Sequence, residues 1–322
     1  RHEPIPSRPP APPLGVTVPG SHARRGKPSR YSFSTRRVSF EGRHGHLFTP
    51  DRPADAPVVV LAPGAGLPWR ESLEPTAERL AERGYAALVF DHTGFGHVGG
   101  DRLLSPARQR DDLAAAIETA RDAPEVDGNR LALWGMDLSA GTALAVAAEN
   151  VRIDAVIARF PVVTGATLLP AWIRPRLGGL ARGVADYPAS MLDRLRGVDN
   201  DERGIRVPLF GDSDEVAAIA AAGAAWSVRD ALGRDPGTTP ARSLVKLQRH
   251  DVHESIAELS CPTLFVAGER DEIAPAESVA EASEEARDAS LVRVPSSHYA
   301  ALDGEELEKV LNYELAFLDA EL

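Results

Sequence analysis

Short apolar runs alternate along this chain with segments of helical period. Val58 to Ala62 is an unbroken apolar run, which is typical of a strand that is buried on both faces of a sheet. The other predicted strands are Tyr85 to Asp91, Leu131 to Trp134, Ala155 to Phe160, Thr263 to Gly268 and Leu291 to Val294. Strands that alternate with helices form a mostly parallel, doubly wound sheet. With an antiparallel hairpin predicted over residues 32–50, we expect an α/β fold with a sheet of about eight strands.

The alternation stops at Pro161 and resumes at about residue 260. An insertion at this point would lie over the carboxyl ends of the strands, where open α/β sheets bind ligands. Prolines crowd the beginning of the chain among arginines and small polar residues, a composition that cannot bury much apolar area. The predicted division is a flexible arm over 1–30, a core formed by 31–160 and 260–322, and an inserted helical cap over 161–259.

Charge and cysteine content exclude several functions. The 322 residues carry a net charge of −11, with acidic residues spread along the chain, so nucleic acid and anionic membranes are poor partners. A single cysteine, Cys261, can form neither an intramolecular disulfide nor a cysteine-based zinc site. The histidine pairs 44/46 and 250/253 match no zinc motif, so we predict no metal or other cofactor. Without a membrane-spanning stretch or signal peptide, we expect a cytoplasmic protein that acts on a small molecule, in an oligomeric state that the sequence does not indicate.

A strand, a sharp turn and a helix meet in the segment LALWGMDLSAG, residues 131–141. Small residues, Gly135 and Ser139, stand two positions before and two after Asp137. A nucleophile elbow has this pattern, because its central residue lies in a strained turn and its neighbours must be small. Aspartate tolerates left-handed backbone better than most residues do. The pattern therefore predicts an elbow with Asp137 at its centre.

Together these stretches resemble the α/β-hydrolase family, and within it the cap-carrying branch that is similar to dipeptidyl peptidases and dienelactone hydrolases. The resemblance spans roughly residues 32–322 and includes LLSPARQ at 103–109, DGNRLALWG at 127–135 and GERDEIAP at 268–275. In the family pattern the elbow carries a nucleophilic serine, and counting along that pattern places it at Asp137.

The resemblance also implies the other parts of an active site. Asp271 matches the acid and His298 the base of a catalytic triad, in the family order of nucleophile, acid and histidine. The oxyanion hole would be formed by the backbone N–H groups of Ala65 and Leu138.

A second register of the elbow stays open. If the motif is shifted by two residues, DLSAG becomes a degenerate G-x-S-x-G with Ser139 as the nucleophile. This register puts a branched acid, Asp137, where crowding demands a small residue. It would indicate a serine-type ester or amide hydrolase.

An aspartate nucleophile predicts a particular substrate class. A carboxylate that attacks an sp³ carbon forms an alkyl ester, whereas its attack on an ester carbonyl would form a high-energy anhydride. In the resembling epoxide hydrolases and haloalkane dehalogenases, histidine-activated water then cleaves the enzyme ester. We therefore expect Asp137, His298 and Asp271 to hydrolyse a small or medium, largely apolar epoxide or halide. Candidate residues of the substrate pocket are His92, Trp172, Tyr187 and Trp226.

The chain also departs from both of these enzyme groups. Leu138 stands where dehalogenases commonly carry a tryptophan, and the loop of residues 63–66 lacks the H-G-x-P motif of epoxide hydrolases. A protein of this fold that only binds a ligand, or that uses Asp137 as an acid or base without hydrolysis, is a third alternative.

Overall fold

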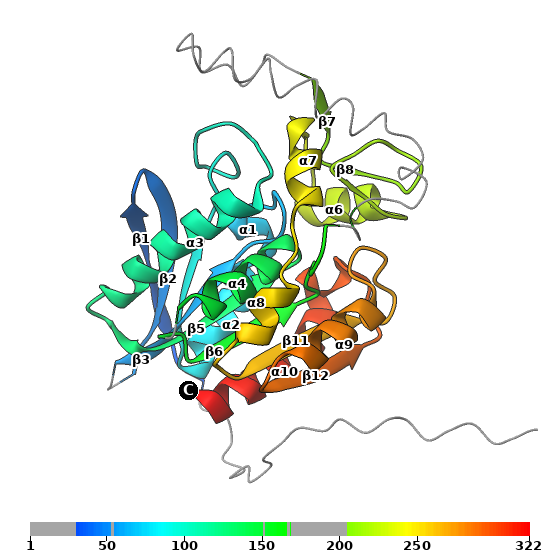
Figure 1. The fold of residues 1–322 in the computed structure, drawn as a ribbon. Helices are drawn as coiled ribbons and strands as arrows, with labels where there is room; N and C mark the ends of the chain where they lie inside the picture. Colours follow the sequence, from blue (N-terminus) through cyan, green and yellow to red (C-terminus); the bar gives the residue numbers. More distant parts are fainter. Residues whose placement is uncertain (1–29, 53–54, 151, 166–167, 169–204) are drawn as a thin grey trace, which may run out of the picture.

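An eight-stranded sheet with the strand order β1-β2-β4-β3-β5-β6-β11-β12 forms the centre of the molecule (Figure 1). The computed structural model describes residues 30–52, 55–150, 152–165, 168 and 205–322. The strands are β1 (Phe33–Phe40), β2 (Arg43–Pro50), β3 (Ala56–Ala62), β4 (Ala86–Phe90), β5 (Val126–Met136), β6 (Ala155–Arg159), β11 (Thr263–Gly268) and β12 (Ala289–Val294). The β1–β2 and β2–β4 pairs are antiparallel and the remaining pairs are parallel. The predicted doubly wound α/β fold is confirmed.

Helices cover both faces of this sheet. The main helices of the core are α2 (Glu74–Arg83), α3 (Pro106–Arg121), α4 (Leu138–Ala148), α8 (His253–Glu258), α9 (Ala276–Glu285) and α10 (Gly304–Glu321), and α1 (Trp69–Ser72) is a single turn. Helices α3, α4, α8 and α9 pack against one face, and α2 and α10 against the other. Successive strand residues point to opposite faces, so Val58 and Val60 belong to the first core and Val59 and Leu61 to the second. The strands are buried on both faces because each of these two cores is apolar.

The segment between β6 and β11 interrupts the alternation of strand and helix. Its described part contains β7 (Arg206–Pro208), β8 (Phe210–Gly211), β9 (Ile219–Ala220), α6 (Ala224–Leu232), β10 (Thr238–Pro240) and α7 (Arg242–Gln248). Strand β10 pairs with β7, and β8 pairs with β9, in two small sheets apart from the main one. Figure 1 shows β7, β8, α6 and α7 together beyond one end of the main sheet.

Contacts of this segment locate it over the carboxyl edge of the sheet. Leu209 lies against Gly66 in the loop after β3, and Arg102 in the loop after β4 donates a hydrogen bond to the carbonyl of Pro236. Helix α8, at the end of the predicted cap, packs instead on α4 and α9. The predicted cap also includes residues 166–167 and 169–204, which lie outside the described residues, as does almost all of the predicted arm. No helix in the described ranges is long and apolar enough to cross a membrane.

Candidate active site

The sharp turn between β5 and α4 is built around Asp137. Its backbone has φ 59° and ψ −130°, a conformation that side-chain-bearing residues rarely adopt. The turn is fixed from both sides, because the Asp137 N–H donates to the carbonyl of Arg159 and its carbonyl accepts from the N–H of Val162. A Cβ atom on Gly135 would lie 2.5 Å from the carbonyl oxygen of Ser139. The close approach of strand and helix therefore explains the glycine two positions before the turn.

The two carboxylate oxygens of Asp137 have different surroundings. The side chain is fully buried, and Oδ2 accepts a hydrogen bond of 3.1 Å from the N–H of Ala65. Oδ1 has no hydrogen-bond partner among the described residues and lies 3.6 Å from Nε2 of His298, which also lacks one. Buried polar atoms in proteins are nearly always hydrogen-bonded, so two that face each other without a bond indicate a place where something acts or binds.

His298 is held in place by Asp271. Its Nδ1 lies 2.7 Å from Oδ2 of Asp271, whose other oxygen accepts hydrogen bonds from the N–H groups of Ile273 and Ala274. The two side chains come from the loops after β12 and β11, so neighbouring parallel strands bring them together. Burial disfavours a charged imidazole, but the Asp271 and Asp137 carboxylates outweigh it and raise the pKa of His298 to about 10. At neutral pH an imidazolium therefore lies between two carboxylates.

Ser139, the alternative nucleophile, has another partner. Its hydroxyl is buried and lies 3.0 Å from Nε2 of His92, whose Nδ1 lies 3.2 Å from Asp112. Arg43 also donates to Asp112. Burial raises the pKa of Asp112, but the hydrogen bonds and charge of its partners outweigh this and lower it to about 2. His92 was expected in the substrate pocket. Instead, its two ring nitrogens lie within hydrogen-bond distance of Ser139 and Asp112 in a buried network.

A small pocket opens beside His298. Its volume is about 70 Å³. Its described lining includes Ile273, Ser297, Tyr299, the alanines 221, 222 and 224, and the charged residues Arg270 and Glu272. Trp226, another expected pocket residue, lies on α6 with 68% of its surface exposed and is absent from this lining. The remaining two, Trp172 and Tyr187, lie outside the described residues.

Comparison with known proteins identifies the family. A family model described as the alpha/beta hydrolase family matches residues 59–310. This chain belongs to the α/β-hydrolase family. The chain is therefore assigned to the hydrolases.

Individual relatives of this α/β hydrolase have low sequence identity to it. The quorum-quenching protein AidA of Acinetobacter baumannii is 29% identical over 283 residues, which cover 85% of this chain and 89% of AidA. The thiohydrolase apmlB of Arthrinium phaeospermum is 34% identical over 110 residues, 34% of this chain and 36% of the relative. Among solved structures, DcsB in complex with its substrate analogue has a TM-score of 0.75 at 20% identity, covering 90% of this chain and all of DcsB. The Pseudomonas aeruginosa protein PA2218 has a TM-score of 0.73 at 20% identity and is matched along its whole length by 96% of this chain. At these identities the two structures show the fold alone.

Tyr299 is a residue of the site that was not predicted from the sequence. It is 5% exposed, lines the small pocket, and its hydroxyl has no hydrogen-bond partner within the described ranges. Burial and the nearby Asp137 carboxylate raise its pKa well above the usual value, so it is a neutral phenol that can donate a proton. Its position next to His298 in the sequence could have suggested a role in the site. This position does not, however, indicate where the side chain points.

The same α/β-hydrolase site offers no arrangement for a metal. Among the residues that the structure describes, no group of three or more His, Cys, Asp or Glu side chains could hold an ion. His46 lies against the Trp69 ring, and His253 lies 2.8 Å from Glu285. The chemistry that this site can perform with its described side chains is attack by a carboxylate and proton transfer by an imidazole and a phenol.

Proposed function

We propose that this hydrolase forms a covalent alkyl-enzyme intermediate on Asp137 and acts on a small or medium, largely apolar epoxide or alkyl halide. One observation carries the proposal: Asp137 Oδ2 accepts a hydrogen bond from the Ala65 N–H, while Oδ1 faces His298 and has no hydrogen-bond partner among the described residues. A nucleophilic carboxylate needs one oxygen fixed and the other available, and this geometry provides both.

Occupation of the Ala65 N–H supports alkyl rather than acyl chemistry. In ester or thioester hydrolysis this donor would have to bind the oxyanion of the substrate. Here it lies 3.1 Å from the enzyme's own carboxylate. During hydrolysis of an alkyl-enzyme the oxyanion develops on the aspartate itself, where Ala65 already donates. The thioester chemistry in the name of the thiohydrolase relative does not fit a site in which this donor is occupied.

In the first step Oδ1 of Asp137 forms a bond to an sp³ carbon of the substrate. The bond from that carbon to halide, or to the epoxide oxygen, breaks and its electron pair stays with the leaving group. An epoxide would leave an alkoxide, which needs a proton, and the neutral Tyr299 hydroxyl is placed to supply it. A halide leaves without a proton.

The second step needs His298 as a base, and the charge of the site controls when it becomes one. In the free enzyme Asp137 and Asp271 keep His298 protonated at neutral pH. Alkylation converts Asp137 into a neutral ester and removes one of these two carboxylates, so the pKa of His298 falls. His298 then gives its proton to the Tyr299 phenolate that remains after reaction with an epoxide, or to solvent after loss of a halide. The neutral imidazole next takes a proton from water, and the hydroxide attacks Cγ of the ester. The bond between Cγ and the oxygen attached to the substrate carbon breaks, His298 returns the proton to that oxygen as the alcohol leaves, and the carboxylic acid of Asp137 protonates His298 again.

Trapping of the intermediate tests the proposal. In His298→Ala the alkylation step remains possible and hydrolysis of the ester stops, so the adduct should accumulate. Intact mass and peptide mapping after incubation with epoxides and alkyl halides should locate it on the peptide that contains Asp137. Asp137→Asn in the His298→Ala background is the matched control and should form no adduct.

Two other outcomes separate the alternatives. Labelling of Ser139 by a fluorophosphonate, with turnover of activated esters, would replace the aspartate nucleophile by the serine. Absence of reaction in both assays by a folded protein would favour a protein of this fold that binds a ligand or uses Asp137 as an acid or base.

A further inference from the structure

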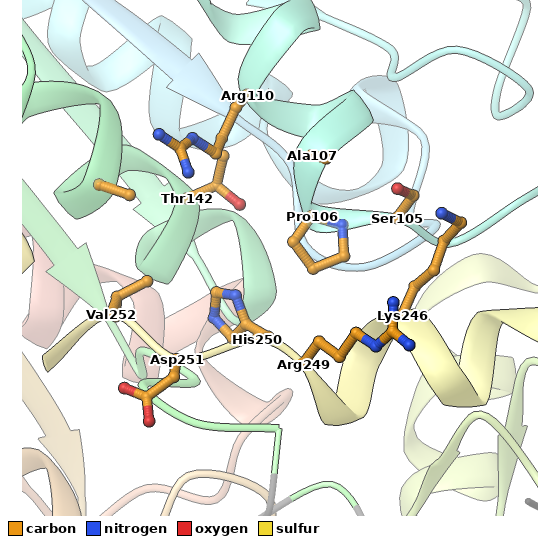
Figure 2. A pocket seen from close by; sticks show the side chains of 11 residues that line it. Ser105, Pro106, Ala107, Arg110, Thr142, Lys246, Arg249, His250, Asp251 and Val252 are labelled. Atoms are coloured by element: carbon orange, nitrogen blue, oxygen red, sulfur yellow. The ribbon is translucent and has the colours of Figure 1, made fainter.

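A second pocket lies beside α4 and is separate from the pocket at His298. It has a volume of about 240 Å³ and shares no lining residue with the pocket at His298. Figure 2 shows its walls: the start of α3, a face of α4, and the segment from the end of α7 to Val252. Neither the proposed reaction nor the family comparison assigns it a role.

Cations without partners distinguish this pocket in a protein of net charge −11. Lys246 and Arg249 line it, and neither forms an ion pair with any residue that the structure describes. Arg110, a third cation in the wall, pairs with Glu149. The acidic lining residue, Asp251, accepts a hydrogen bond from the N–H of His253, and Figure 2 shows its carboxylate turned away from Lys246 and Ser105. The two unpaired cations, Lys246 and Arg249, therefore outnumber the one carboxylate in the described lining.

Two buried polar side chains in the wall each have an atom without a hydrogen-bond partner among the described residues. Ser105 precedes α3 and is 5% exposed, yet its hydroxyl does not cap the helix and has no other partner in the described part of the chain. His250 is 6% exposed, and its Nε2 lies 2.8 Å from the carbonyl oxygen of Val162. A carbonyl only accepts, so Nε2 carries a proton, and in the neutral ring Nδ1 then has a free lone pair. Burial lowers the pKa of His250 by more than the bond to Val162 and the Asp251 carboxylate raise it, which favours this neutral form.

We propose that this pocket binds hydrogen phosphate. Lys246, Arg249 and the Ser105 hydroxyl donate to its charged oxygens, and the first turn of the 16-residue helix α3 adds its positive end. His250 Nδ1 accepts from the oxygen that keeps a proton. Sulfate has the same size and shape but carries no proton near neutral pH, so it leaves this lone pair facing an anion.

Titration of the purified chain with inorganic phosphate at constant ionic strength tests the proposal. Phosphate well above its dissociation constant should raise Tm by at least about 2 °C, because it binds the folded chain alone. Calorimetry should give sulfate an affinity about tenfold or more below that of phosphate, since sulfate lacks the hydrogen bond to His250. Equal affinity for the two anions, or no change in Tm with either, would overturn the proposal.

Variants locate the binding. Lys246→Ala and Arg249→Gln should each weaken phosphate binding about tenfold or more, because each removes a charge-assisted hydrogen bond. Lys309→Ala is the matched control: it removes the same charge from α10, where Lys309 pairs with Glu305 away from the pocket. All three side chains lie at or near the surface, so the variants should fold. Unchanged affinity in both pocket variants, or an equal loss in Lys309→Ala, would contradict a site at this pocket. None of these measurements depends on the reaction at Asp137.

Discussion

Removal of one partner from the ion pair between Arg159 on β6 and Glu314 on α10 should strongly destabilise this fold. Arg159 Nε lies 2.8 Å from one carboxylate oxygen of Glu314 and Nη2 lies 2.5 Å from the other, while the guanidinium stacks 4.6 Å from the ring of Trp134. The side chains are 0% and 1% exposed. A third donor, Nη1, reaches the carbonyl of Ala301. Removal of the carboxylate would leave a buried guanidinium with that carbonyl as its one remaining acceptor among the described residues.

We expect Glu314→Ala to lower the free energy of unfolding by about 3–5 kcal/mol, because an uncompensated buried charge costs this much. For a domain of this size that loss corresponds to a fall of at least about 6 °C in Tm. Urea unfolding followed by circular dichroism measures it. Glu308→Ala, on the same helix, is the matched control. Glu308 pairs with Arg79 and is nearly half exposed, so its loss should cost no more than about 1 kcal/mol.

The double variant Arg159→Met with Glu314→Leu separates the cost of a lone charge from the value of the pair. Replacement of a buried ion pair by apolar residues of similar size is often neutral or stabilising. The double variant should therefore be more stable than Glu314→Ala by at least about 2 kcal/mol. A loss below about 1 kcal/mol in Glu314→Ala, or a double variant no more stable than the single one, would refute this account of the pair.

Two further predictions concern the active site. Asp137→Ser should free the N–H of Ala65 and place a hydroxyl near His298. This variant should therefore hydrolyse activated esters at least about tenfold faster than Asp137→Ala does. Release of nitrophenol from a nitrophenyl ester measures both rates. His298 has a folded pKa of about 10 against about 6.5 unfolded, so its charge stabilises the fold fully below pH 6.5 and progressively less as pH rises toward 10. The difference in unfolding free energy between wild type and His298→Asn should therefore shrink between these pH values; a difference that stays constant across them would contradict the raised pKa.

Much of the core could be predicted from the sequence because its signals are local. Runs such as Val58 to Ala62 are apolar throughout since the strand is covered on both faces, and this pattern requires no knowledge of its neighbours. The elbow is also a local feature: Gly135 is required by a contact with Ser139, only four residues away. The short strands β7 to β10 carry no such pattern, because two or three residues are too few to show a period.

Interactions between distant residues were beyond sequence analysis. His92 was expected to line the substrate pocket, but its ring lies between Ser139 and Asp112, which are 47 and 20 residues away in the chain. Nothing in the local sequence distinguishes a histidine at the carboxyl edge that faces the site from one that faces α3. The proposed phosphate pocket could not be predicted for the same reason. Ser105 and Lys246 are far apart in the sequence and line one pocket only in the folded chain. The net charge of the whole chain, −11, gives no indication of a local excess of cations.

The environment of Asp137 helps to distinguish a catalytic role from a purely structural one. Its positive φ costs of order 1–3 kcal/mol in a residue other than glycine, and its buried Oδ1 has no hydrogen bond to any residue that the structure describes. It also shares His298 with a second carboxylate, Asp271, so two buried acids face one base. A glycine at this turn would avoid all three costs while keeping the backbone bonds to Arg159 and Val162. Strain and an unsatisfied polar group at one residue are characteristic of functional sites, where local rules of stability are broken for chemistry. Because the unbonded oxygen points at an imidazole that Asp271 orients, the costs are concentrated at the atoms that the alkylation mechanism uses.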